Sequence, residues 1–230
     1  MKNHDTLIGP LIQGFFLEHL LNHKNASPQT ISSYRDTFRL LLQFIHKRQK
    51  ISPVSLHITD MEAPLIIAFL DHLEKERNNT IRSRNGRLAA IRSFYRWVTL
   101  CNPENIALAT RVLAIPTKRT SHRIVSSLSR DEIDALLATP DLKQWQGRRD
   151  HALFSTLYNT GARVSEIICL QRDQVQFGES SFIHLLGKGR KERDVPIWKE
   201  TAINLKRWFR EHDESTMIAF PSARGTRVFP

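Results

Sequence analysis

Two short segments in the second half of the chain carry side chains that could act on an anion. Arg163 lies just after Gly161, where a helix is expected to begin, and helix N-termini favour anions. Its guanidinium adds a bidentate clamp, and Glu166, one turn on, is placed to orient it. Lys188 lies between two glycines on an expected turn, where it could donate a proton or a charge-assisted hydrogen bond. Lys191 is the alternative donor on that turn.

Neither segment is specific by itself. An Arg after a Gly most often ends a helix or lies on the surface. A Gly-Lys turn most often reflects only the backbone conformation that a turn requires of its glycines. The GKGRK sequence also lacks the G-x-x-x-x-G-K-[ST] spacing of a nucleotide-binding loop. Both segments in this order, about 25 residues apart and behind a basic helical region, are much more specific.

The second half of the chain, which carries Arg163 and Lys188, is expected to form several helices and one β-hairpin. Lys188 and Lys191 lie at the tip of that hairpin. The expected elements are a helix after a Ser129–Glu132 capping box, helices at 150–158 and 164–170, strands at 181–186 and 193–197, and a helix at about 199–212. The first hundred residues instead predict a small four-helix bundle. Its apolar stripes lie at 7–15, 31–45, 65–73 and 81–98, with an N-cap at Ser27-Pro28 and a capping box at Thr59–Glu62. The expected fold is therefore mainly α with a small β-hairpin.

Charge indicates the class of partner. The chain has 34 Lys and Arg against 23 Asp and Glu, which gives a net charge of +11 and a pI near 10.1. Such a field attracts nucleic acid first and an acidic membrane surface second, although a solvated basic surface is the simpler alternative. Residues 107–127 hold four basic residues and no acid. We expect them to form an extended linker between domains at 1–106 and 128–230.

The fourth helix of the first part is the strongest candidate for nucleic-acid contact. Between Glu76 and Glu104 the chain has no acidic residue, and the planar fork of Arg suits phosphates and guanine edges. A solvated basic face is an equally good interpretation of this helix alone. The candidate DNA-contacting residues of the helix and linker are Arg82, Arg84, Arg87, Arg92, Arg96, Lys118 and Arg119. Among them we expect Arg84, Arg87 and Arg92 to be the best candidates.

Other classes of protein are excluded or disfavoured. The longest apolar run, Leu65–Leu70, is too short to span a bilayer, and the N-terminus lacks the apolar core of a secretory signal. Cys101 and Cys169 lie far apart with no Cys or His at metal-ligand spacing. We therefore expect no metal site, no disulfide and no membrane association, and a cytoplasmic location.

Several segments resemble the tyrosine recombinase, or phage integrase, family, and within it the Xer-like members. The resemblance covers essentially the whole chain, with one small departure at Ala162, where a larger apolar residue is common. The segments are SPQTISSYRDTFRLLLQFI and RSRNGRLAAIRSFYRWV in the first part, then LSRDEIDALLA, GRRDHALFSTLYNTGARVSEIICLQRDQV, GKGRKERDVPI and the weaker Phe220-Pro221-Ser222 mark. The resemblance implies a SAM-like core-binding domain followed by an α+β catalytic domain.

The resemblance also implies a chemistry: site-specific breakage and rejoining of double-stranded DNA through a 3′-phosphotyrosyl intermediate, with no metal or nucleotide cofactor. By position, Arg163 would stabilise the phosphorane, Lys188 would protonate the leaving 5′-oxygen, and Glu166 would support Arg163. Lys191 is the fallback acid. The family works as a homo- or hetero-oligomer on DNA, in a synaptic tetramer. The element served, whether phage, transposon or other mobile element, integron or chromosome resolver, stays open.

Two family features are absent from this sequence. None of the ten histidines is followed by Arg three positions later, and the three tyrosines, Tyr34, Tyr95 and Tyr158, all precede Arg163. We therefore expect a C-terminally truncated catalytic domain without its nucleophile, inactive in strand transfer and without an assured tetramer. The alternatives are a non-catalytic DNA-binding remnant or competitor of a recombinase, and an unrelated basic nucleic-acid binder.

Overall fold

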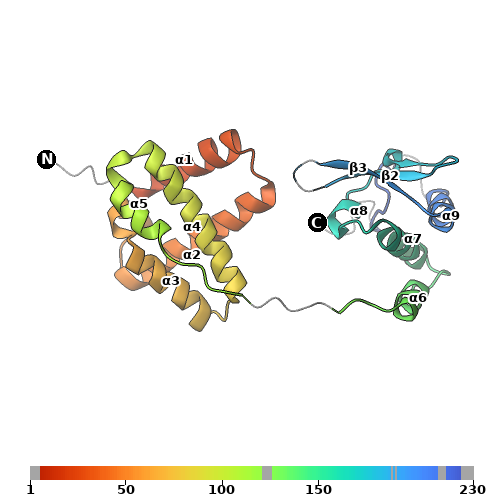
Figure 1. Cartoon of the computed structure of the whole chain (residues 1–230), viewed down its shortest axis with the longest axis horizontal. Coiled ribbons are helices and arrows are strands. Elements are labelled where there is room, and N and C mark those ends of the chain that lie inside the picture. Colours follow the sequence, from red (N-terminus) through yellow and green to blue (C-terminus); the bar gives the residue numbers. More distant parts are fainter. Residues whose placement is uncertain (1–5, 121–125, 188, 190, 212–215, 224–230) are drawn as a thin grey trace. The chain divides into compact units, whose positions relative to one another are not determined.

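The computed structural model of the chain describes residues 6–120, 126–187, 189, 191–211 and 216–223. The chain forms two compact units, Met1–Ile124 and Val125–Pro230 (Figure 1), called here the first and second unit. The division at 1–106, 107–127 and 128–230 stays a prediction. Among the described residues, no helix is long and apolar enough to cross a bilayer.

The described elements of the first unit are helices, apart from one isolated β-bridge between Leu7 and His57. Its longer elements are α1 (Ile8–Gly14), the π-helix η1 (Phe15–His23), α2 (Pro28–Gln49), α3 (Ala63–Lys75), α4 (Ile81–Cys101) and α5 (Ile106–Leu113). Short 3₁₀ turns lie at η2 (Pro53–Ser55), η3 (Ile58–Asp60) and η4 (Pro103–Asn105). The four expected helices are present, and α1 and η1 together carry the first of them.

Local capping explains where two of these helices begin. The Ser27 hydroxyl accepts the amide of Thr30 at 3.3 Å, and Pro28 follows it at the first helical position. The expected Thr59–Glu62 capping box is wrong. Thr59 lies inside η3, and Glu62 precedes α3 without a side-chain cap. A capping box lies two residues earlier and opens η3, where Asp60 accepts the amide of His57 at 2.9 Å.

An aromatic core packs α4 against the other helices of the first unit. Phe15, Phe38 and Phe94 are buried and meet edge to face, with ring centroids 5.3–6.0 Å apart. Tyr95 is fully buried, and its hydroxyl donates to the carbonyl of Met61 at 2.6 Å. The helix with the most arginines is therefore also a central core helix.

The residues expected to begin an extended linker are helical. Residues 106–113 form α5, and Ala109, Val112 and Ile115 are buried in the core of the first unit. Thr110 and Arg111 interrupt the apolar sequence but face outward, since the three buried residues recur every third position.

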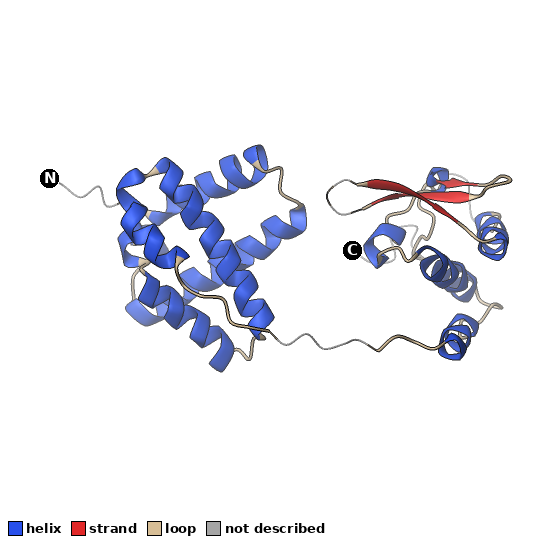
Figure 2. Cartoon of the chain, viewed as in Figure 1, coloured by secondary structure: helices blue, strands red, loops and turns tan. Residues whose placement is uncertain are grey.

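The second unit joins a small sheet to a group of helices. Its elements are α6 (Arg130–Ala138), α7 (Trp145–Thr160), α8 (Val164–Ile167), η5 (Arg172–Gln174), β1 (Val175–Gln176), β2 (Phe182–Leu186), β3 (Glu192–Pro196) and α9 (Lys199–Phe209). The strands are antiparallel in the order β1-β2-β3, with Ile183 opposite Val195 and Leu185 opposite Arg193. The expected hairpin is confirmed, and β1 adds a third strand. Helices α7 and α9 pack together on one side of the sheet (Figure 2).

The core of the second unit lies between that side of the sheet and the helices. Ile183 and Leu185 alternate inward along β2 and join Trp208 and Phe220 in one apolar cluster. The indole of Trp208 donates to the carbonyl of Ala219 at 2.8 Å. The Ser129–Glu132 capping box is confirmed, with the Ser129 amide donating to the Glu132 carboxylate at 2.7 Å.

Candidate functional site

Arg163 is held at the start of α8 by the turn before it and by Glu166 after it. Helix α7 ends at Thr160 and is followed by Gly161, whose φ of +58° is a left-handed value that favours glycine. Arg163 is then extended and serves as the residue before α8. The Glu166 carboxylate accepts both the Arg163 amide and its Nη1, each at 2.9 Å. The expected support of Arg163 by Glu166 is thus present as two hydrogen bonds.

A third residue, Arg193 on β3, completes this cluster. Its Nη2 lies 2.6 Å from Oε2 of Glu166 and its Nη1 lies 3.3 Å from Oε1, so the pair is bidentate. The Glu166 side chain is only 4% exposed. The hydrogen bond from Arg193, followed by those from Arg163, outweighs desolvation and lowers the pKa of Glu166 to about 2. Glu166 is therefore a carboxylate near neutral pH.

Sequence reasoning did not single out Arg193, although a signal was available. Arg193 and Val195 alternate on β3 with exposed residues, so both lie on the face of the strand that is turned inward. An arginine on such a face is partly withdrawn from water and therefore favours a carboxylate partner, because burying an unpaired charge is costly. Glu166 is the partner, 27 positions earlier in the chain.

The guanidinium of Arg163 remains accessible although it is paired. Its side chain is 63% exposed, whereas the carboxylate that holds it is buried. Only one of its terminal nitrogens is used by Glu166. The result is an oriented cation, at the start of a short helix, that can still bind an anion from solvent.

The β2–β3 turn begins beside the same cluster. A Cβ added to Gly187 would lie 3.1 Å from both Nη1 of Arg193 and Oε1 of Glu166, which is tighter than ordinary contact. The Gly187 amide donates to the carbonyl of Lys191 at 2.7 Å. Lys191 itself is exposed. Lys188 lies outside the described residues, so its role as proton donor stays a prediction.

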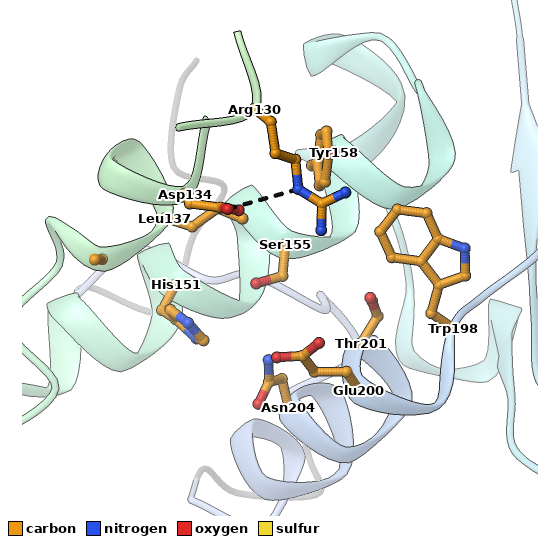
Figure 3. Close-up of a pocket in the computed structure, with 11 residues that line it drawn as sticks. Arg130, Asp134, Leu137, His151, Ser155, Tyr158, Trp198, Glu200, Thr201 and Asn204 are labelled. Atoms are coloured by element: carbon orange, nitrogen blue, oxygen red, sulfur yellow. Dashed lines mark ion pairs between the residues drawn. The ribbon is translucent and has the colours of Figure 1, made fainter. Parts of the chain in front are cut away.

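Tyr158 lines a pocket of about 290 Å³ between α6, α7 and α9 (Figure 3). Its ring packs edge-on against Trp198, with centroids 5.6 Å apart, and His151 and Ser155 line the same pocket. Arg163 does not line this pocket. Tyr158 therefore packs within the second unit, as Tyr95 does in the first.

The arginines of α4 fall into two groups. Three are engaged by the protein itself: Arg84 pairs with Glu74 at 2.8 Å, Arg87 pairs with Asp36 at 3.0 Å, and Arg92 donates to the carbonyl of Ile115. Arg84 is only 4% exposed. Its carboxylate partner lies on α3 and its side chain is withdrawn from solvent, which disfavours a contact with DNA. The expected contact of Arg84 with DNA stays a prediction. Arg82 and Arg96 are exposed.

The residues that follow α5 run along α4. The side chain of Asn85 donates to the carbonyl of Lys118 at 2.7 Å and accepts its amide at 3.1 Å. The Lys118 ammonium pairs with Glu74 at 2.8 Å. Arg119 is exposed. Among the described residues, no cluster of His, Cys, Asp and Glu could hold a metal ion.

Comparison with known proteins identifies the family. The description "Phage integrase, N-terminal SAM-like domain" matches residues 14–100, and "Phage integrase family" matches residues 126–229. The chain is 48% identical, over 99% of its length and 69% of the relative, to putative integrase/recombinase y4rC of Sinorhizobium fredii. The chain belongs to the phage integrase family of tyrosine recombinases. It is also 30% identical to tyrosine recombinase XerD of Pseudomonas putida, over 95% of this chain and 72% of that protein.

Solved structures of this family share its fold. The post-cleavage complex of XerH recombinase with palindromic difH substrate has a TM-score of 0.66 at 16% identity, over 89% of this chain. The λ integrase tetramer bound to a Holliday junction has a TM-score of 0.65 at 14% identity, over 97% of this chain. This chain spans 60% and 62% of the length of those two family members.

Proposed function

We propose that this chain works in site-specific DNA recombination, where it binds duplex DNA and presents Arg163 to a phosphate of the backbone. The observation that carries the proposal is a guanidinium oriented by the buried carboxylate of Glu166 and yet 63% exposed. A phosphate oxygen is the anion that such a fork fits. The net charge of +11 supports the same class of partner.

In this proposal the chemistry is phosphoryl transfer. Arg163 stabilises the charge that develops on the non-bridging oxygens as the phosphorus becomes pentacoordinate. Glu166 keeps Arg163 in place, and Lys188, with Lys191 as the fallback, protonates the leaving 5′-oxygen. Relatives solved as DNA complexes, one of them a tetramer on a Holliday junction, support assembly on DNA.

The attacking tyrosine is not one of the three in this sequence. Tyr95 is buried with its hydroxyl bound to Met61, and Tyr158 packs against Trp198. Tyr34 is half-buried and stacks on Phe15 at 6.3 Å. We therefore propose that the chain binds DNA without forming the phosphotyrosyl bond by itself. A non-catalytic site occupant or competitor is the second candidate function, and these three placements favour it.

The exposed side chains carry the DNA-binding part of the proposal. On α4 these are Arg82 and Arg96, and beyond α5 they are Arg119 and, with one ion pair to Glu74, Lys118. Arg87 and Arg92 are half-buried and bonded within the protein, so we assign them a smaller part.

The first experiment measures binding of the chain to a 30-bp duplex by fluorescence anisotropy at several salt concentrations. We expect the affinity to fall steeply with salt, and Arg163→Gln to weaken it more than Arg163→Lys, which keeps the charge but not the fork. No binding at low salt would contradict the proposal.

The second experiment separates the two candidate functions. The chain is incubated with a nicked duplex that traps covalent intermediates, and protein–DNA adducts are sought on a denaturing gel. We expect no adduct from the chain alone. A covalent adduct at any of its tyrosines would overturn the assignment of a binding-only chain and show that the nucleophile is present.

A further inference from the structure

Arg193 has a contact that the proposed roles of Arg163 and Glu166 do not explain. It lies on β3 opposite Leu185, its side chain is 38% exposed, and both of its terminal nitrogens reach the Glu166 carboxylate. An ion pair of this kind can simply hold a strand to a helix. The way in which Arg163 and Arg193 share the two oxygens of the Glu166 carboxylate indicates a more specific function for Arg193.

Each oxygen of Glu166 is shared by both arginines. Oε2 accepts the Arg163 amide at 2.9 Å and Arg193 Nη2 at 2.6 Å. Oε1 accepts Arg163 Nη1 at 2.9 Å and Arg193 Nη1 at 3.3 Å. The rotation of the carboxylate is therefore fixed by Arg193 as well as by the α8 backbone. Since Arg163 is mostly exposed, this carboxylate is the main restraint on its guanidinium.

The same pair also restrains the start of the β2–β3 turn. Gly187 approaches Arg193 Nη1 and Glu166 Oε1 so closely that a side chain at this position would require a shift of its neighbours. The residue after Gly187 is Lys188. Arg193 thus lies between the segment that carries Arg163 and Gly187, where the turn begins.

We propose that Arg193 is a positioning residue, which acts through Glu166 to fix the Arg163 guanidinium and to hold the stem of the β2–β3 turn against it. The three charged side chains keep a net charge of +1, so the cluster still attracts an anion. The functional part of this inference rests on the proposed binding of phosphate by Arg163. The positioning itself can be measured without DNA.

The test compares Arg193→Gln with a matched control on the same strand. Asp194 is the neighbour of Arg193, also lies in an ion pair (2.7 Å, to His184), and faces the opposite side of the sheet. Nitrogen NMR of the guanidinium groups reports the order of Arg163 in the free protein, with Arg163→Lys used to assign its signal. We expect an ordered Arg163 Nε signal in the wild type and in Asp194→Asn, and an averaged signal in Arg193→Gln.

Two further measures keep the test decisive. Arg193→Lys retains the charge and one hydrogen bond, so we expect partial order from this variant if Arg193→Gln folds poorly. Circular dichroism confirms folding of each variant. An Arg163 signal that is equally ordered in a folded Arg193 variant would overturn the proposal, whatever the protein does with DNA.

Duplex affinity then relates the positioning to the proposed function. We expect Arg163→Gln and Arg193→Gln each to weaken binding about fivefold and the double variant to weaken it no further, since coupled residues are not additive. Additive losses would show that Arg193 acts independently of Arg163 and would overturn the coupling. If Arg163→Gln leaves the affinity unchanged, the proposed function fails, and the NMR result still decides whether Arg193 positions Arg163.

Discussion

Replacement of Arg84 by Ala tests whether this arginine of α4 stabilises the first unit or contacts nucleic acid. Its side chain is 5% exposed, and Nε lies 2.8 Å from the Glu74 carboxylate, which is itself 20% exposed. Removal of one partner of a buried ion pair leaves the other charge uncompensated and costs about 3–5 kcal/mol. Glu74 keeps its second partner, Lys118, at 2.8 Å. We therefore expect a loss near the low end, about 3 kcal/mol.

The free-energy loss converts into a large change of melting temperature. An unfolding entropy of about 2.1 cal/mol/K per residue gives about 0.26 kcal/mol/K for a unit the size of Met1–Ile124. A loss of about 3 kcal/mol then lowers the melting temperature of this unit by about 12 °C. Differential scanning calorimetry of the whole chain measures this change directly.

Arg82 provides the matched control, because it lies two positions earlier on α4 and is exposed. We expect Arg82→Ala to leave the melting temperature within about 2 °C, as for most surface changes. If Arg82 contacts a phosphate, its loss lowers the slope of log affinity against log salt by about 0.9. For Arg84→Ala we expect an unchanged slope. A reduced slope with an unchanged melting temperature in Arg84→Ala would refute this reasoning.

Two further predictions concern the second unit. A Cβ at Gly147 would lie 2.0 Å from the carbonyl oxygen of Asp141. Gly147→Ala should therefore lower the free energy of unfolding, measured in urea, by about 3 kcal/mol or more. The control is Gly86→Ala on α4 of the first unit, where a Cβ meets nothing within 4 Å, and this change should be neutral or stabilising. The pKa of Glu166 is lowered from 4.5 to about 2, chiefly by Arg193, so its contribution to stability is complete above pH 4.5 and is lost as the pH falls towards 2. Glu166→Gln should therefore show a weaker loss of unfolding free energy over that pH range, and an equal loss would contradict the assigned pairing.

Local sequence signals predict the elements that depend on neighbouring residues. Ser27 and Ser129 cap helices through amides three positions later, so the capping pattern is sufficient to place both helix starts. Glu166 meets Arg163 for the same reason, since the two residues lie three positions apart at the start of α8. The hairpin follows from alternation of apolar residues and the glycine-rich turn.

Contacts between distant segments cannot be predicted in this way. Composition alone places the arginines of α4 on a solvated or DNA-facing surface, but the partners of three of them lie in other segments of the first unit. Asp36, on α2, is 51 positions from Arg87, and no periodicity within α4 reports it. Arg193 meets Glu166 across 27 positions, and only its inward register on β3 indicates a buried partner. Tertiary pairing of charges is therefore the part of the site that required the structure.

The contacts of Asn85 and Lys118 determine how the first unit would respond to a mechanical load on the chain. Tension applied beyond residue 118 first meets two hydrogen bonds between Asn85 and the Lys118 backbone, and then the ion pair of Lys118 with Glu74. The load passes through these side chains into α4 and α3, the central elements of the unit. Helix α5 and the buried Ile115 lie behind this attachment. The attachment therefore shields α5 from being peeled away when the chain is pulled.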